Sequence, residues 1–145
     1  MSNLRRGVDY PGITCVFVCH DGNGKILMHK RSVNCRDEKL RWDKGAGCLE
    51  FREELIDAVR REVRDEYLCD SLKIEYAQTT NVLRMNEETP THWVAVVFAV
   101  LVDPKEAKTG EPHKMDDIGW FFPVNLPTPL HSMAERHLES VKHLI

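Results

Sequence analysis

The sequence predicts an α/β fold in which a mixed β-sheet lies between helices. Two observations lead to this prediction. Segments with β-strand composition stand before, between and after two helical segments, and no repeat, low-complexity tract or interdomain linker interrupts the chain. We therefore expect residues 1–145 to form a single domain, long enough to bury a core without disulfides. The pattern leaves the order of the strands open.

Two runs rich in β-branched and aromatic residues predict a hairpin at the start of the chain. Ile13–Cys19 predicts the first strand, and the glycine-containing turn Asp21–Gly24 leads to a returning strand over Lys25–Arg31. The charged stretch Ser32–Arg41 predicts a surface loop. A short segment at Trp42–Leu49 connects this loop to the first helix.

The clearest helix of the sequence is predicted over Arg52–Leu68. Apolar residues recur there every four positions and form one stripe: Leu55, Val59, Val63 and Tyr67, with Ile56 beside them. Glu53, Glu54 and Asp57 lie near the start of this helix, where negative charge is favoured by the helix dipole.

The second half of the chain predicts three more strands. Ser71–Leu83 and Trp93–Val102 are separated by a turn-like segment at Asn86–Pro90, and Trp93–Val102 has the composition of a buried strand. The polar connection Asp103–Asp117 precedes a short aromatic strand, Ile118–Phe122.

A final helix is predicted after the prolines that follow Asn125. Ser132 and Glu135 have the spacing of a capping box at its start. Apolar residues at helical spacing form its buried stripe: Ala134, Leu138, Val141 and Ile145.

Composition excludes several functional classes. A net charge of −3 argues against an electrostatic grip on a nucleic-acid polymer. The longest apolar run, Trp93–Val102, is shorter than the ~20 residues that a membrane helix needs. The five cysteines include no C-x-x-C pair, which favours reduced thiols and a cytoplasmic protein.

Three acidic residues share one face of the first helix. Glu62, Asp65 and Glu66 stand at positions i, i+3 and i+4, with Cβ atoms about 5–6 Å apart. Carboxylate oxygens on a rigid scaffold suit Mg²⁺ or Mn²⁺. Such spacing by itself is more typical of a solvated helix face, so the surrounding residues decide between the two interpretations.

The surrounding residues resemble the Nudix box, G-x5-E-x7-R-E-U-x-E-E-x-G-U, where U is a bulky aliphatic residue. This motif belongs to the MutT-like Nudix hydrolases. Six positions match it with the spacing intact: Gly47, Glu53, Arg61, Glu62, Val63 and Glu66. Asp65 replaces the first Glu of the E-E pair, Leu68 replaces the Gly and Cys69 replaces the final aliphatic residue. The resemblance implies a Nudix α/β/α sandwich with the mixed sheet between helices.

The resemblance also implies roles for individual residues. Glu62, Asp65 and Glu66 match the carboxylates that hold divalent metal, and the backbone at Gly47 matches a further metal contact. Glu53 and Arg61 match a pair that steadies the loop and helix, and with Glu62 and Glu66 they form the expected catalytic set. At Leu68, either the helix continues to about Asp70 or the turn takes a different shape from that of the family.

The implied reaction is Mg²⁺-dependent hydrolysis of a nucleoside diphosphate linked to another group, by attack of a metal-activated water on phosphorus. A nucleoside triphosphate or nucleotide sugar is the expected substrate, and a homodimer is compatible with the resemblance. We expect Arg31, Arg41 and Glu111 to bind substrate. Candidates for the general base are a box carboxylate and the loop acids Glu87, Glu88 and Glu111. Candidates for stacking on a base are Trp93, Phe121 and Phe122.

Two alternatives remain open at the level of sequence. Trp42-Asp43-x-Gly45-Ala46-Gly47 is faintly similar to isopentenyl-diphosphate isomerases, which share the fold. The departures at Asp65 and Leu68 are compatible with a non-catalytic nucleotide-binding module.

Overall fold

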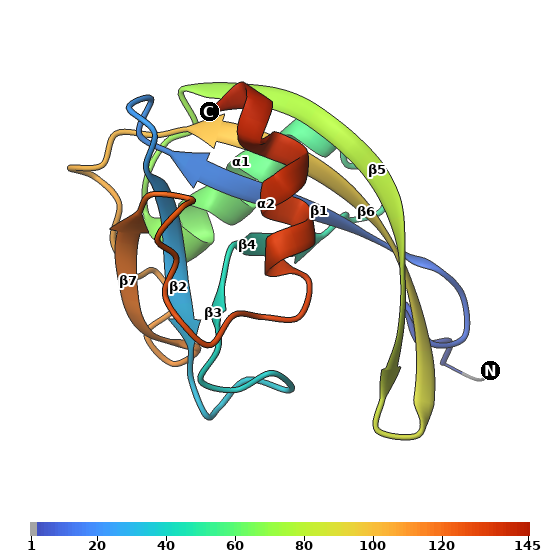
Figure 1. Cartoon of the computed structure of the whole chain (residues 1–145). Helices are drawn as coiled ribbons and strands as arrows, with labels where there is room; N and C mark the ends of the chain where they lie inside the picture. Colours follow the sequence, from blue (N-terminus) through green and yellow to red (C-terminus); the bar gives the residue numbers. More distant parts are fainter. Residues whose placement is uncertain (1–2) are drawn as a thin grey trace.

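The computed structural model describes residues 3–145, and a seven-stranded sheet between two helices dominates it (Figure 1). The strands are β1 (Gly12–His20), β2 (Ile26–Arg31), β3 (Trp42–Asp43), β4 (Gly45–Cys48), β5 (Lys73–Asn86), β6 (Thr89–Leu101) and β7 (Met115–Phe121). The helices are α1 (Leu55–Tyr67) and α2 (Ala134–Val141), and a 3-10 turn (Lys142–Leu144) follows α2. The predicted α/β class with a mixed sheet is confirmed.

The sheet order is β3-β2-β1-β6-β5, with β1 and β6 parallel and the other neighbours antiparallel. One edge of β1 is shared by two partners. His20 pairs with Ile26 of β2, whereas Thr14–Phe17 pair with β4. β7 pairs with the other side of β2. β2 leaves this edge of β1 after the single pair and β4 pairs further along it, so the two strands diverge from one another alongside β1.

The alternation of side chains along β1 explains why both faces of the sheet are covered. Phe17 and Cys19 face the core under α1, and Val16 and Val18 face the core under α2. In α1, Val59, Val63 and Tyr67 of the predicted stripe are fully buried, but Ile56 is partly exposed. In α2, Ala134, Leu138 and Val141 are buried as predicted.

Several local predictions are wrong. β7 begins at Met115 rather than Ile118. The first helix begins at Leu55 rather than Arg52, because Arg52 has a positive φ of 65° that no helix accommodates. The turn between β5 and β6 is confined to Glu87 and Glu88, since the ladder continues through the pair Asn86–Thr89.

The predicted capping box of α2 is also absent. The N-cap residue is Met133, which makes no side-chain capping bond. The Ser132 hydroxyl donates instead to Glu38 Oε2, 2.8 Å away.

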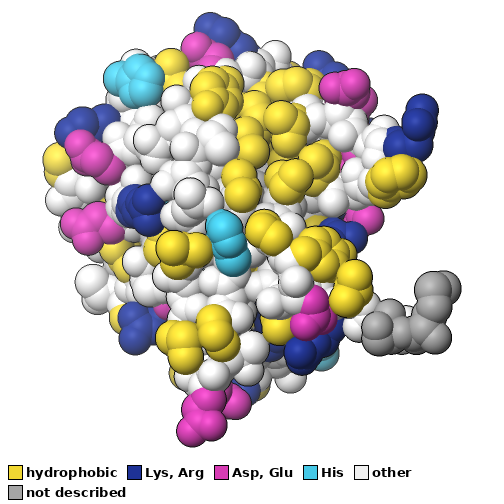
Figure 2. All heavy atoms as spheres, turned by 90° about the vertical axis from the view of Figure 1, so that its right-hand side faces the viewer, with side chains coloured by type: hydrophobic (Ala, Val, Ile, Leu, Met, Phe, Trp, Pro, Cys, Tyr) yellow, Lys and Arg dark blue, Asp and Glu magenta, His cyan; other side chains and the backbone are white. Residues whose placement is uncertain are grey.

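Exposed apolar side chains gather on the face that Figure 2 shows. Exposed apolar residues of the outer strand β5 are Tyr76, Leu83 and Met85. No helix within residues 3–145 is long and apolar enough to cross a membrane.

Candidate functional site

A cleft of about 520 Å³ lies where β2 and β4 separate, beside α1. We call it the carboxylate cleft. Its lining includes residues of β2, β4 and α1 and of the loops before β3 and β7: His29, Arg31, Arg36, Ala46, Cys48, Glu66, Glu111 and Lys114. The cleft combines carboxylates with basic side chains, which suits a phosphate ligand bound together with a cation.

Glu66 is the buried acid of this cleft. Its side chain is held at the inner face of α1, and Oε2 has no hydrogen-bond partner among the described residues. Burial raises the pKa of Glu66 well above its usual range, and the nearby carboxyls Glu62 and Glu111 raise it further. A buried carboxylate oxygen without a partner is costly unless a cation or a proton neutralises it, so this oxygen fits a divalent ion.

Arg61 organises the start of the Nudix-like segment. Its guanidinium donates to both carboxylate oxygens of Glu53, with Nε–Oε2 and Nη2–Oε1 distances of 2.9 Å. The same side chain donates to the Cys48 carbonyl and to Glu62 Oε1. These hydrogen bonds lower the pKa of Glu53 to about 2. The predicted steadying pair of Glu53 and Arg61 is therefore present, and it also orients Glu62.

Gly47 is required because Glu62 packs directly against it. A Cβ at position 47 would lie 2.2 Å from Glu62 Cδ. This close approach holds the Glu62 carboxyl against the backbone of β4. Burial raises the pKa of Glu62, although Arg61 opposes the shift.

The expected metal ligands are only partly brought together. Glu66 lines the carboxylate cleft and Glu62 lies against Gly47, but Asp65 is exposed to solvent. Across residues 3–145, no three His, Cys, Asp or Glu side chains converge closely enough to enclose a metal ion. The donor chemistry fits Mg²⁺, and the unpartnered oxygen of Glu66 is the feature that most favours it.

The end of α1 differs from both shapes that the sequence suggested. Leu68 itself adopts the left-handed conformation, with φ 54° and ψ 32°, and its N–H donates to the Arg64 carbonyl. The helix therefore ends with the backbone that a glycine would supply, despite a cost of about 1–2 kcal/mol for an L-residue.

The loop before β7 docks onto this helix end. The N–H groups of Lys108 and Gly110 donate to the carbonyls of Tyr67 and Glu66, each over 2.8 Å. A Cβ at Gly110 would lie 2.1 Å from the Asp65 carbonyl oxygen, so only glycine permits this approach. As a result Glu111, the next residue, lines the carboxylate cleft with Glu66.

A second cavity of about 270 Å³ opens beside the cleft, over the face of the sheet that α2 covers. We call it the sheet pocket. Arg31 and Arg36 line both cavities and therefore stand where the two meet. The apolar part of its wall comes from several strands and the α2 segment: Val16, Ala46, Val82, Trp93, Ala95 and Met133.

The indole of Trp93 is fixed by the N-terminal segment. A Cβ at Gly7 or at Gly12 would lie 2.5 Å from atoms of the Trp93 side chain, and the His92 N–H donates to the Gly7 carbonyl. Of the three aromatic residues proposed to stack on a base, Trp93 lines the sheet pocket. Phe121 packs edge-on against Trp42, and Phe122 lies under the Lys25 ammonium.

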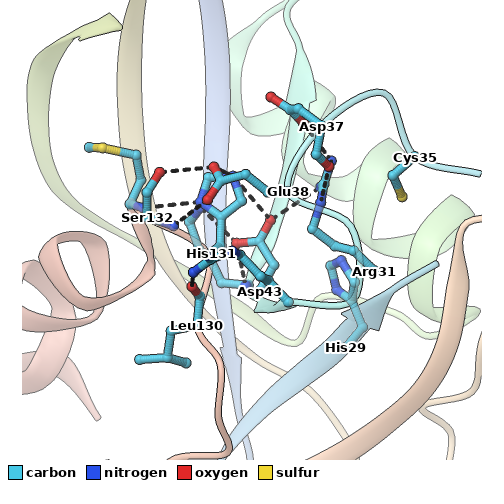
Figure 3. Close-up of polar contacts among 12 residues, drawn as sticks. His29, Arg31, Cys35, Asp37, Glu38, Asp43, Leu130, His131 and Ser132 are labelled. Carbon is cyan, nitrogen blue, oxygen red and sulfur yellow. Dashed lines mark hydrogen bonds and ion pairs between the residues drawn. The ribbon is translucent and has the colours of Figure 1, made fainter. Parts of the chain in front are cut away.

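A network of charged side chains forms the polar rim of the sheet pocket (Figure 3). Glu38 accepts hydrogen bonds from the Ser132 N–H and hydroxyl and from Arg84 Nη2, at 2.6–2.8 Å. Its Oε2 also lies 2.8 Å from His131 Nε2. These bonds fasten the loop before β3 to β5 and to the start of α2.

The tautomer of His131 follows from its two partners. Nδ1 accepts the Met133 N–H over 3.0 Å, so Nε2 carries the hydrogen that Glu38 accepts. Burial lowers the pKa of His131. Burial would raise the pKa of Asp43, but the Lys44 ammonium 2.9 Å away, His131 and His29 bring it well below its usual range.

The three expected substrate-binding residues occupy different places. Arg31 lines both cavities and pairs with Asp37 at 2.9 Å and Asp43 at 3.4 Å. Glu111 lines the cleft. Arg41 is exposed and donates to the Leu130 carbonyl, so its contact with substrate stays a prediction.

Several cavity residues were missed by the sequence reasoning: Arg36, Arg84, His131 and His137. Glu38, which hydrogen-bonds to Arg84 and contacts His131, was missed as well. Each lies in a segment that was interpreted as a surface loop, a strand or a helix, with no functional role assigned to the residue. The charged composition of residues 32–41 was the only local feature of the sequence that indicated a functional role for any of them.

Comparison with known proteins identifies the family of the chain. The sequence of residues 10–144 matches the profile described as the NUDIX domain. Mouse 8-oxo-dGDP phosphatase NUDT18 is 27% identical over 139 residues, which cover 93% of this chain and 39% of that protein. This chain thus spans about two fifths of that relative's length.

Solved structures share the fold. A MutT NUDIX hydrolase from Burkholderia pseudomallei superposes with a TM-score of 0.80 at 26% identity, covering 91% of this chain and 98% of that one. The NUDIX domain of Shewanella oneidensis NrtR, solved with ADP ribose, gives a TM-score of 0.70 at 18% identity over 93% and 86% of the two chains. With the motif, the fold and the profile in agreement, the chain belongs to the Nudix hydrolase family.

Proposed function

We propose that this protein hydrolyses a nucleoside diphosphate linked to another group, with Mg²⁺ or Mn²⁺ as cofactor. The observation that carries the proposal is the junction of two unlike cavities at Arg31 and Arg36. One cavity has the buried carboxylate of Glu66 with basic groups, and the other combines an apolar wall that includes Trp93 and Met133 with charged side chains. A nucleotide likewise consists of two unlike parts, because a charged phosphate chain is attached through the sugar to a flat, mostly apolar base.

Glu66 and Glu62 are the side chains proposed to hold the metal, with the backbone at Gly47. The unpartnered Oε2 of Glu66 supports this assignment. The bound ion would lower the pKa of a water and neutralise charge on the phosphate oxygens. Asp65 is proposed to contribute only at a distance, because it is exposed.

The remaining groups of the cleft have separate tasks in this proposal. Arg31, Arg36 and Lys114 bind phosphate oxygens by charge-assisted hydrogen bonds. Arg61 holds Glu62 in place and does not contact substrate. Glu111 accepts the proton of the attacking water, because it shares the cleft with Glu66, whereas Glu88 lies in the turn at the tip of the β5–β6 hairpin.

The substrate of the mouse relative guides the choice of nucleotides. That protein is named for its action on 8-oxo-dGDP, a nucleoside diphosphate. We therefore extend the expected substrates from nucleoside triphosphates and nucleotide sugars to nucleoside diphosphates, including oxidised ones.

The test is a screen with Mg²⁺ over these three groups of nucleotides, run on the wild type and on Glu66→Gln. Phosphate is measured after added pyrophosphatase for the triphosphates, after added phosphomonoesterase for the nucleotide sugars, and directly for the diphosphates. We expect the substitution to lower kcat by about 100-fold or more, as removal of one preorganised electrostatic group does. Glu139→Gln is the matched control, because Glu139 is an exposed acid on α2 that forms a surface ion pair with Lys142. It is expected to retain full activity.

Three results would contradict the proposal in different ways. Full turnover by Glu66→Gln would remove Glu66 from the mechanism. Thermal stabilisation by nucleotides without any turnover would favour a binding module. Isomerisation of an allylic diphosphate without phosphate release would favour the isomerase alternative.

A further inference from the structure

One buried polar side chain of the sheet pocket is used by none of the interactions described so far. His137 lies on α2, is 2% exposed and lines the pocket. Neither Nδ1 nor Nε2 has a hydrogen-bond partner among the described residues. Only its backbone is engaged, since its carbonyl accepts the Ser140 hydroxyl over 2.6 Å.

The other buried histidines do not share this property. Both ring nitrogens of His131 have partners, in Met133 and Glu38. Nδ1 of His29 lies 2.6 Å from the Tyr67 hydroxyl. Native proteins leave few buried polar atoms unpaired, so an unpaired group that lines a cavity indicates a partner that arrives with a ligand.

The charge state of His137 limits what that partner can be. Burial lowers its pKa to about 3, and the nearby Lys44 ammonium lowers it further. The ring is therefore neutral near pH 7, with one N–H donor and one nitrogen acceptor. A neutral imidazole gives no ion pair to a phosphate. Beside the apolar side chains of Trp93 and Met133 it suits an uncharged polar group, and Asp43 and Lys44 line the same pocket.

The size of the pocket limits the ligand further. At about 270 Å³ it is slightly smaller than the 300–1,000 Å³ typical of sites for complete small molecules. It therefore suits one part of a ligand whose remainder lies in the carboxylate cleft. Trp93 and Met133 supply apolar surface for a flat ring, and His137 supplies a hydrogen bond.

We propose that the sheet pocket receives the heterocyclic base of the substrate and that His137 is a specificity-determining residue, hydrogen-bonded to a polar edge atom of that base. This inference rests on the proposed function. It adds a residue and a recognition chemistry that the Nudix-like motif does not contain. The neutral ring can offer its donor or its acceptor, so it selects polar heterocycles over apolar groups or bare diphosphates.

The test compares Mg²⁺-dependent phosphate release from GDP, UDP and methyl diphosphate, which has no base. In His137→Leu we expect the ratio of kcat/KM for GDP or UDP to that for methyl diphosphate to fall at least about tenfold, mainly through KM. His143→Leu is the control, because His143 is an exposed histidine in the turn after α2, and its ratio is expected to match the wild type. His137→Gln, which keeps a donor and an acceptor, is expected to recover part of the ratio.

Stability gives a second readout. Leucine removes two unpaired buried nitrogens, so His137→Leu is expected to melt about 2–4 °C higher than the wild type without ligand. An equal loss of activity on all three substrates, or a lower melting temperature, would assign His137 to packing and overturn the proposal.

A failure of the proposed function can be told apart from a failure of this inference. If the wild type releases no phosphate from any substrate, thermal shifts with guanosine and uridine decide. Stabilisation of the wild type but not of His137→Leu by either nucleoside would support the base pocket. No stabilisation of the wild type would overturn it.

Discussion

The buried hydrogen bond between His29 and Tyr67 joins β2 to α1 beside Glu66. Nδ1 and the hydroxyl are 2.6 Å apart, and the two residues are 5% and 0% exposed. Tyr67→Phe removes the hydroxyl and leaves the imidazole nitrogen buried without a partner. The expected cost is about 1–3 kcal/mol of unfolding free energy. At roughly 3 °C per kcal/mol, the melting temperature is expected to fall by about 3–9 °C.

Urea unfolding followed by circular dichroism measures this cost. The midpoint is expected to fall while the slope with denaturant stays unchanged, because the native surface is preserved. Tyr76→Phe is the matched control. The Tyr76 hydroxyl contacts Thr79 Oγ1 at an exposed site, so its removal is expected to change stability by less than about 0.5 kcal/mol. The reasoning is refuted if Tyr67→Phe keeps the wild-type midpoint or if both variants lose the same amount.

Three further predictions follow from the backbone and from buried histidine. Leu68→Gly is expected to raise stability by about 0.5–1 kcal/mol in urea unfolding, because relief of the left-handed strain exceeds the added entropy of the unfolded chain; a loss would contradict the strain. Gly45→Ala is expected to lose about 2 kcal/mol or more in the same assay, since its Cβ would lie 1.9 Å from the Phe17 ring; tolerance of alanine would refute the close packing. Burial lowers the pKa of His29 to about 4, so the stability that depends on its neutral form is present above pH 6.5 and is lost as the pH falls towards 4, by up to about 3 kcal/mol. Midpoints measured at pH 7 and pH 5 test this, and the same slope in His29→Leu would show that other groups cause it.

Local patterns in the sequence were sufficient for most elements of secondary structure and for part of the site. The four-residue spacing of Val59, Val63 and Tyr67 identified the buried face of α1, because a helix repeats every 3.6 residues. The pairing of Glu53 with Arg61 was also predictable, since the motif fixes their separation. The boundary of α1 was not, because the left-handed backbone at Arg52 has no signature in a non-glycine residue.

The polar half of the site depends on contacts between segments that are distant in sequence. Glu38 and Ser132 are 94 positions apart, yet two hydrogen bonds join them. Likewise, the N–H of Gly110 donates to the carbonyl of Glu66 on a different element. Periodicity and motif spacing contain no information on contacts between distant segments. His137 could therefore not be identified as a pocket residue before the fold was known.

The parallel pairing of β1 with β6 has a consequence for biosynthesis. Gly12 is paired with Trp93 and His20 with Leu101, so β1 leaves the ribosome long before its partner exists. At 5–20 residues per second, this delay is on the order of 4–16 s. During that interval the apolar segment Val16–Cys19 has no parallel neighbour and is open to association with other nascent chains. A chaperone that shields the first strand during translation is therefore expected to raise the yield of folded enzyme more than one that acts after release.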